Sequence, residues 1–159
     1  MTSLPGSRWC LCQPWHGGGV AENSWASSPA RRRNMQANRH RDTTPELAVR
    51  RLLHAQGFRY RVDVRPVGVL RRRADIVFTK QRIAVFIDGC FWHGCPEHGT
   101  RTFKTNGEYW TPKIARNVAR DRETSELLIE AGWTVLRYWE HDPPGEVAQA
   151  VARTVQHAR

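Results

Sequence analysis

The chain has 159 residues, a formal net charge of +10 and a sequence pI near 10.5, and 22 of its 25 basic residues are arginine. This length suits one domain, and the lack of a secretion-type N-terminus or of any run near the roughly 18 apolar residues of a membrane helix predicts a cytoplasmic protein. Arginine contacts phosphates and guanine edges with two hydrogen bonds at once, so the charge favours a nucleic-acid partner. A GC-rich genome is an alternative source of the arginine.

The first part of the chain lacks regular apolar periodicity. Residues 1–30 are rich in Gly, Ser and Pro, so we expect a disordered tail. Residues 31–43 form a basic arm in which Met35 is the one large apolar residue. Such an arm either stays solvated or becomes ordered on DNA. Residues 44–159 are predicted to form the folded domain.

The segment TPELAVRRLLHAQG predicts a helix at the start of this domain. Thr44 can cap it, Pro45 suits the first helical position and Gly57 ends it. Glu46 then lies at the positive end of the helix.

The rest of the domain alternates between strand and helix patterns. Lys80 and Gln81 are predicted to form the turn of a hairpin, and Gly132 to stop a long helix. This order favours an α/β fold with a mixed β-sheet flanked by helices. The predicted elements are strands at 58–67, 74–80 and 82–88, a helix at 108–132, a strand at 133–139 and a helix from 145.

Two aspartates mark one edge of the predicted hairpin. Asp75 lies at the start of one strand and Asp88 at the end of the next, so their side chains are expected to meet. Carboxylates a few ångströms apart repel unless a cation relieves them, and Mg²⁺ prefers oxygen ligands. Mg²⁺ beside a basic surface indicates phosphodiester chemistry. The alternative is that Asp88 only begins a turn and Asp75 is an edge residue.

Thiols and imidazoles gather in the segment CFWHGCPEH. Cys90, Cys95 and His98 offer closely spaced ligands of the type that favours Zn²⁺ over Mg²⁺. A structural zinc site needs a fourth ligand, and His93 is one candidate. We choose His141, because it follows a strand that is expected to return to the same sheet edge. If His93 is not a ligand, it suits acid–base catalysis near neutral pH. The alternative is a pair of buried thiols without metal.

Three aromatic residues accompany this segment. Phe91 and Trp92 are consecutive, and Trp110 opens the long helix. Large apolar side chains on a basic surface can wedge between base steps and kink DNA. The alternative is ordinary core packing.

Five segments together resemble the very-short-patch repair (Vsr) endonuclease family, over most of the chain from about residue 33 to residue 142. The resemblance implies a restriction-endonuclease-like (PD-(D/E)xK) fold with a structural zinc site, so that residues 44–159 are a nuclease domain. It implies Mg²⁺-dependent nicking of one DNA strand beside a T:G mismatch, the lesion that deamination of 5-methylcytosine leaves. The segments are NMQANRHRDTTPE, RADIVF, AVFIDGCFWHGCPEH, EYWTPKIARNVARDR and GWTVLRYWEHD.

The resemblance also implies roles for single residues. Asp75 matches the catalytic metal-binding aspartate, His93 the catalytic histidine, and Glu46 a glutamate that supports the site through water on the metal. Cys90, Cys95 and His141 fall on zinc-ligand positions, and His98 fills the remaining place after a small shift in spacing. The predicted DNA contacts are Phe91, Trp92 and Trp110 as the wedge, Met35 as an inserting residue of the arm, and Lys113, Asn117 and Arg120 on the long helix.

The sequence departs from the family pattern where Ile87-Asp88 stands in place of Thr-His. Asp88 would then replace the missing histidine as metal ligand or proton carrier. The lysine typical of this fold is also missing, as it is in the family, so His93 and the metal would share its task of charge neutralisation.

Double-stranded DNA with a T:G mismatch is the expected partner, and mismatch-repair proteins are further candidates. We expect a monomer that does not bind membranes. Because a fold does not fix a substrate, two alternatives stay open: a restriction-type endonuclease and a non-catalytic zinc-bound DNA-binding module.

Overall fold

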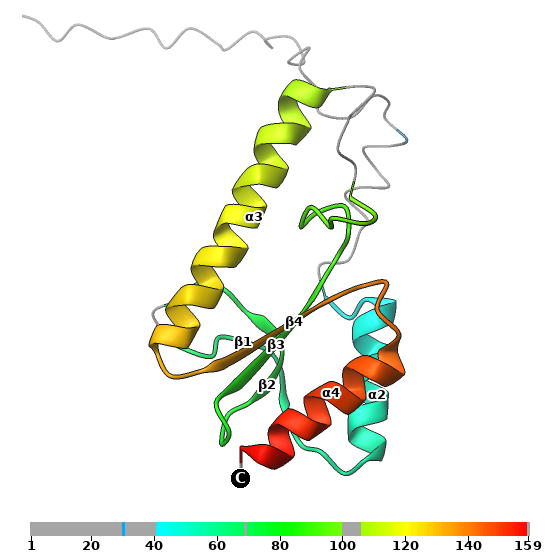
Figure 1. Ribbon diagram of the computed structural model, residues 1–159, viewed down its shortest axis with the longest axis vertical. Helices are drawn as coiled ribbons and strands as arrows, with labels where there is room; N and C mark the ends of the chain where they lie inside the picture. Colours follow the sequence, from blue (N-terminus) through cyan, green and yellow to red (C-terminus); the bar gives the residue numbers. More distant parts are fainter. Residues whose placement is uncertain (1–29, 31–40, 69, 100–105, 159) are drawn as a thin grey trace, which may run out of the picture.

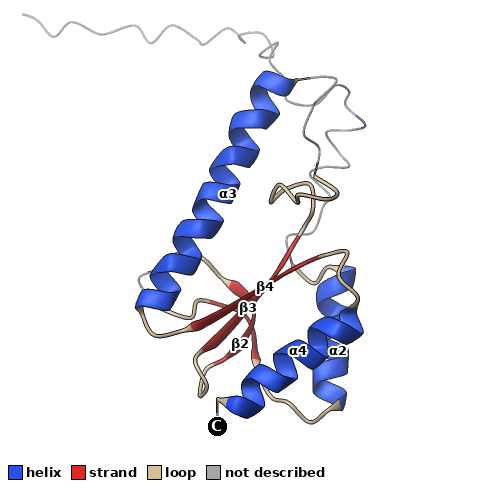
Figure 2. Ribbon diagram, viewed as in Figure 1, coloured by secondary structure: helices blue, strands red, loops and turns tan. Residues whose placement is uncertain are grey.

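The computed structural model describes residue 30 and residues 41–68, 70–99 and 106–158. These residues form a four-stranded sheet with helices on both faces (Figures 1 and 2), in the order of elements that the sequence predicts. No helix in these ranges has the length and apolar character to cross a membrane. The elements are α2 (Thr44–Ala55), β1 (Arg61–Val64), β2 (Ala74–Phe78), β3 (Ile83–Asp88), α3 (Gly107–Glu130), β4 (Thr134–Trp139) and α4 (Pro144–His157).

The sheet is mixed, as predicted, and its strands lie in the order β1-β2-β3-β4. The first three strands are antiparallel neighbours, and β4 pairs with β3 in parallel through the crossover helix α3. At the end that carries the site, the last β2–β3 pair is Ile76 with Val85. Strand β3 stays paired with β4 as far as Asp88 and Trp139. The last residues of β3 therefore extend beyond their pairing with β2.

The sheet separates two hydrophobic clusters of unequal size. On one face α2 and α4 cover the larger cluster, which includes Leu53, Ile76, Val85 and Val151. On the other face α3 contributes Leu128 to a smaller cluster. The part of α3 that precedes this contact extends beyond the sheet, alongside the loop that follows β3 (Figure 1).

The start of α2 differs from the prediction by one residue. Thr43, not Thr44, is the N-cap residue, so Pro45 occupies the second helical position. The Thr43 hydroxyl donates to Glu46 Oε1 at 2.8 Å, and the backbone N–H of Asp42 donates to Glu46 Oε2 at 3.0 Å. Because the Glu46 side chain reaches back in this way, it secures the residues before the helix and fixes its own carboxylate.

Candidate active site and metal-ligand cluster

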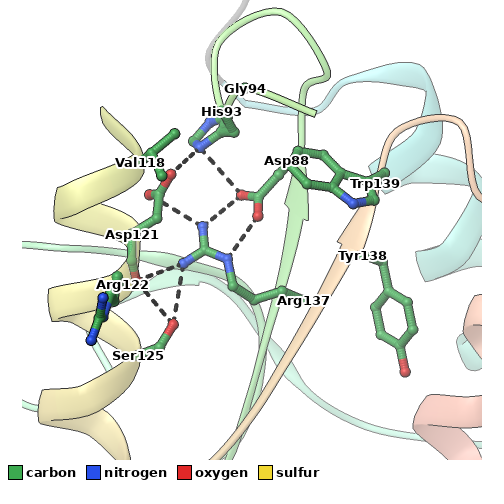
Figure 3. Close-up of a pocket in the computed structure, with 10 residues that line it drawn as sticks. All are labelled: Asp88, His93, Gly94, Val118, Asp121, Arg122, Ser125, Arg137, Tyr138 and Trp139. Carbon is green, nitrogen blue, oxygen red and sulfur yellow. Dashed lines mark hydrogen bonds and ion pairs between the residues drawn. The ribbon is translucent and has the colours of Figure 1, made fainter. Parts of the chain in front are cut away.

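Four charged side chains meet where β3 ends (Figure 3). Asp88 is the last residue of β3, and His93 comes from the loop at 89–99. Asp121 reaches them from α3 and Arg137 from β4. All four line a cavity of about 320 Å³. Three elements that are distant in sequence therefore build one polar site.

Asp75 is a mostly buried carboxylate on β2, beside this network. Its Oδ2 accepts a 2.7 Å hydrogen bond from the backbone N–H of Ile87. Burial is the main reason that the pKa of Asp75 is raised to about 7, and the carboxylates of Glu46 and Asp88 act in the same direction. The structure thus brings Asp75 close to both acids with which the sequence analysis associated it.

Glu46 is 3% exposed, and protein groups bind both of its oxygens. In addition to its contacts with Asp42 and Thr43, it accepts a 2.7 Å hydrogen bond from Arg50 Nη2. Arg50 is 7% exposed, and its Nε has no partner among the described residues. The Arg50 charge lies close enough to Asp75 to oppose the rise in its pKa. Glu46 is therefore a fixed residue in an ion pair at the edge of the site.

Asp88 is paired with an arginine. Arg137 Nε donates to Asp88 Oδ2 at 2.7 Å, and Arg137 Nη2 donates to Asp88 Oδ1 at 2.8 Å. This two-bond contact neutralises the carboxylate that the sequence analysis assigned to Mg²⁺. Asp75, in contrast, makes only the hydrogen bond to backbone within the described part of the chain. Of the two aspartates, Asp75 has the carboxylate that is more accessible to a cation.

His93 and Asp121 form a close pair. His93 Nδ1 lies 2.5 Å from Asp121 Oδ2 and 3.6 Å from Asp88 Oδ1. Because an ionised carboxylate only accepts hydrogen bonds, we assign the proton to Nδ1. Burial acts to lower the pKa of His93, but the Asp121 hydrogen bond and the charges of Asp88 and Asp121 raise it overall. Burial acts to raise the pKa of Asp121, yet its contacts with His93 and Arg137 lower it.

Asp121 and Arg137 are site residues that the sequence analysis did not identify. Asp121 lies in the charged run ARDRE, which is typical of a solvated helix face. Arg137 offers a better sign, because it is a charged residue inside the otherwise apolar strand segment TVLRYW. Such a residue needs a buried partner of opposite charge.

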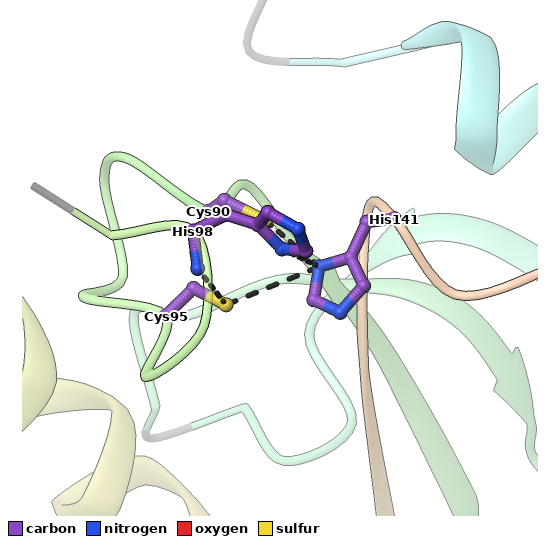
Figure 4. Close-up of side chains that lie close together, drawn as sticks. All are labelled: Cys90, Cys95, His98 and His141. Carbon is purple, nitrogen blue, oxygen red and sulfur yellow. Dashed lines mark hydrogen bonds between the residues drawn. The ribbon is translucent and has the colours of Figure 1, made fainter.

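A second group of side chains has the chemistry of a metal site (Figure 4). The ligand atoms of Cys90, Cys95, His98 and His141 all lie within 4.8 Å of one another. His141 Nδ1 is 3.0 Å from Cys90 Sγ, 3.9 Å from Cys95 Sγ and 3.2 Å from His98 Nδ1. Tetrahedral zinc with normal bond lengths places its ligand atoms about 3.3–3.8 Å apart. The cluster therefore fits the predicted ligand set, and His93 faces Asp121 instead.

The two thiols of this cluster differ in acidity. Burial, together with Cys95 and Glu140, raises the pKa of Cys90 to about 12. Burial also acts to raise the pKa of Cys95, but backbone N–H groups, among them that of His98 at 3.4 Å, lower it overall. Two such sulfurs beside two imidazoles form a donor set that suits a transition-metal ion.

The predicted aromatic wedge is one packed cluster. Its ring centroids are 5.1 Å apart for Phe91 and Trp92, 5.2 Å for Phe91 and Trp110, and 5.8 Å for Trp92 and Trp110. Trp110 is 6% exposed, while Phe91 and Trp92 are half-buried. The structure thus brings the three rings together, and it also gives Trp110 the core packing that was the alternative to a wedge.

The other predicted DNA contacts separate into three kinds. Lys113 Nζ lies 5.5 Å from the ring centroid of Trp92, and Asn117 Nδ2 donates to the Trp92 carbonyl at 3.0 Å. Both side chains therefore support the aromatic cluster. Arg120 is exposed on α3. Met35 lies outside the described residues.

Gly99 is the last described residue of the loop that carries Cys90, Cys95 and His98 of the metal-ligand cluster. Its N–H donates to the Cys95 carbonyl at 2.8 Å, and a Cβ at this position would lie 2.3 Å from that oxygen. We expect Gly99→Ala to displace the loop, to reduce bound metal and to lower the free energy of unfolding by about 2 kcal/mol. Thermal unfolding and metal analysis would measure this. Gly145→Ala, whose Cβ meets nothing within 4 Å, is the matched control; equal behaviour of the two variants would contradict the expectation.

Comparison with known proteins gives the class of this site. A family model described as DNA mismatch endonuclease Vsr matches residues 26–98, which include Asp75, Asp88 and His93. Together with the relatives described below, which are covered over more than two thirds of their length, this match shows that the chain is an endonuclease that acts on DNA. It belongs to the Vsr family of DNA mismatch endonucleases, as the sequence analysis predicted.

Several relatives match most of the chain. A type II nicking enzyme, V.NaeI of Lentzea aerocolonigenes, is 51% identical over 129 residues, which are 80% of this chain and 77% of the relative. Another, V.XorIIP of Xanthomonas oryzae pv. oryzae, is 44% identical over 117 residues, 71% of this chain and 82% of the relative. The DNA mismatch endonuclease Vsr of Escherichia coli (strain K12) is 41% identical over 113 residues, 69% of each chain.

Proposed function

We propose that this protein nicks one strand of duplex DNA beside a T:G mismatch, with Mg²⁺, in very-short-patch repair. The observation that carries the proposal is the loop at 89–99. Within it, Phe91 and Trp92 belong to the aromatic cluster, and the next residue, His93, pairs with Asp121 in the polar site. Mismatch recognition and strand cleavage would then share one segment. Relatives named as nicking enzymes and as a DNA mismatch endonuclease support both parts.

Asp75 is the residue best suited to hold Mg²⁺. It is a largely buried carboxyl whose pKa the nearby acids Glu46 and Asp88 help to raise, so a divalent cation would relieve unfavourable charge there. The ion, when bound, would polarise the scissile phosphate and make water a stronger nucleophile. Asp88, held by Arg137, would line the site beside the ion, and Glu46 would support the site from α2.

His93 is our candidate for proton transfer. Its contact with Asp121 fixes the ring and the tautomer, with the proton on Nδ1. The other ring nitrogen, Nε2, can then take a proton from the attacking water or give one to the leaving oxygen. Asp121 is a positioning residue in this scheme, because it acts through the imidazole.

We assign Zn²⁺ to the cluster of Cys90, Cys95, His98 and His141, with a structural role. Four protein ligands would leave no coordination position open for a substrate. The ion would join the loop after β3 to the segment after β4. This would hold Phe91 and Trp92 in place for insertion beside the mismatch. Trp110 and Met35 of the arm would insert there as well.

The remaining assignments concern the DNA surface and the chain organisation. We assign residues 31–43 to a basic arm that binds DNA and residues 44–159 to the nuclease domain; the predicted tail lies, apart from residue 30, outside the described residues. Arg120 would contact phosphate, and Lys113 and Asn117 would act at the DNA through the aromatic cluster they support. The protein would work as a monomer in the cytoplasm, on double-stranded DNA, with mismatch-repair proteins as further candidate partners.

The test is strand-specific cleavage of a labelled duplex that carries one T:G mismatch in varied flanking sequence. The proposal expects Mg²⁺-dependent cutting of the T strand only, none with EDTA, and none on the matched T:A and C:G duplexes. Equal cutting of matched duplex would favour a restriction-type enzyme. Tight binding without cleavage in any context would favour a DNA-binding module.

A further inference from the structure

Arg137 lies at the centre of the polar site, where it contacts both Asp88 and Asp121. We propose that Arg137 positions His93 by fixing the two carboxylates that face the imidazole, and that Asp88 serves as a partner in this network and not as a metal ligand. The inference rests on the proposed role of His93 in strand cleavage.

The contact with Asp88 occupies one side of the guanidinium. Two hydrogen bonds, of 2.7 and 2.8 Å, hold both oxygens of Asp88, which is 8% exposed. The Arg137 guanidinium lies 4.8 Å from the ring centroid of Phe86, which limits its motion. Asp88 Oδ1 lies 3.6 Å from His93 Nδ1. Arg137 therefore sets the orientation of the Asp88 carboxylate and, with it, the position of this oxygen relative to the imidazole.

The other side of the guanidinium reaches α3. Nη2 lies 3.2 Å from Asp121 Oδ1, and Nη1 donates to the Asp121 backbone carbonyl at 3.0 Å. The other oxygen of Asp121, Oδ2, is the one that binds His93. Asp121 is therefore held between Arg137 and His93, and its backbone is tied to β4. Figure 3 shows these contacts converging on one guanidinium.

The chemistry of the side chain explains why an arginine is needed. A planar guanidinium presents several N–H groups in fixed directions and can join two carboxylates at once. A lysine ammonium at this position would keep the charge but could not make the two-bond contact with Asp88 while it also reached Asp121. Without the cation, two partly buried carboxylates would face each other and His93, and they would repel.

The first test uses the protein without DNA. In ¹⁵N-histidine NMR spectra, assigned with His93→Gln, we expect a slowly exchanging Nδ1–H signal from His93. It should broaden or vanish in Arg137→Ala. It should persist in Arg153→Ala, which removes an exposed arginine from α4. An unchanged signal in Arg137→Ala, or no slowly exchanging signal in the wild type, would overturn the proposal.

The second test measures nicking of the T:G duplex. Arg137→Ala and Arg137→Lys are each expected to lower kcat about 100-fold with little change in KM, because a small misplacement of a catalytic group has such an effect. Added guanidinium, but not ammonium, should restore part of the Arg137→Ala activity. A loss confined to KM, a lysine variant near wild type, or no rescue of folded Arg137→Ala would contradict the positioning role.

Failure of the proposed nicking function can be distinguished from failure of the proposed role of Arg137. If the wild-type protein does not nick mismatched DNA, the proposed function fails, while the NMR comparison still decides whether Arg137 orders His93. If Arg137→Ala does not fold, Arg137→Lys retains the charge and most of the volume and answers both questions.

Discussion

Asp75→Asn is expected to lower the rate of Mg²⁺-dependent nicking about a thousandfold, which corresponds to the several kcal/mol that a bound metal contributes to a transition state. The amide oxygen of asparagine can still accept the N–H of Ile87, so the fold keeps this hydrogen bond. The substitution also removes a buried charge from the neighbourhood of Glu46 and Asp88. We therefore expect the thermal midpoint of the metal-free protein to stay the same or rise.

The matched control for this variant is Asp63→Asn. Asp63 is an aspartate on the neighbouring strand β1, where its carboxylate pairs with Arg73 at 3.0 Å. Nicking by Asp63→Asn should stay close to wild type. Isothermal titration with Mg²⁺ would separate a lost ligand from a disturbed fold. Full activity of Asp75→Asn would remove Asp75 from the metal site, and a lowered thermal midpoint would show that its charge stabilises the fold.

Cys95→Ser is expected to abolish metal binding at the Cys/His cluster and to lower the free energy of unfolding by about 4 kcal/mol. This is the stabilisation that a ligand gives at about 1,000 times its dissociation constant. Cys95 is 2% exposed, and the ligand atoms of Cys90, His98 and His141 lie within 4.8 Å of its sulfur. Metal content per chain and thermal unfolding with and without a chelator would measure both effects.

The control for this variant is Cys12→Ser, which lies outside the described residues and to which the sequence analysis gives no role. It should retain one Zn²⁺ per chain and the wild-type thermal midpoint. A chelator should lower the thermal midpoint of wild type but not that of Cys95→Ser. Equal metal content in wild type and Cys95→Ser would contradict the proposed zinc site.

Local patterns were enough to predict most of the architecture. The apolar segments around Lys80 and Gln81 indicated a hairpin, and β2 and β3 are antiparallel on either side of this turn. His141 could be linked to the cysteines because it follows a strand that was expected to return to the same sheet edge, and β4 does so beside β3. Both predictions could be made because short segments of the sequence strongly favour strands.

The network around His93 could not be predicted in the same way. Asp88 pairs with Arg137, which is 49 residues away in sequence, and His93 pairs with Asp121, which is 28 residues away. These contacts depend on the parallel register of β3 and β4 and on the crossing of α3. Neither is visible in the residues themselves. The sequence therefore indicated that Asp88 needs a cation, but not that the cation is a guanidinium.

The two faces of the sheet have unequal shares of the hydrophobic core, and this affects how the molecule can lose activity. Helices α2 and α4 enclose the larger cluster, whereas α3 is held by Leu128 near its C-terminal end and by Trp110 of the aromatic cluster near its N-terminal end. Local opening follows the regions with the least buried apolar contact. The middle of α3, which bears Asp121, lies between these two contacts and is therefore expected to separate from the site while the α2–α4 side stays folded. Inactivation by heat or mild denaturant would then precede global unfolding.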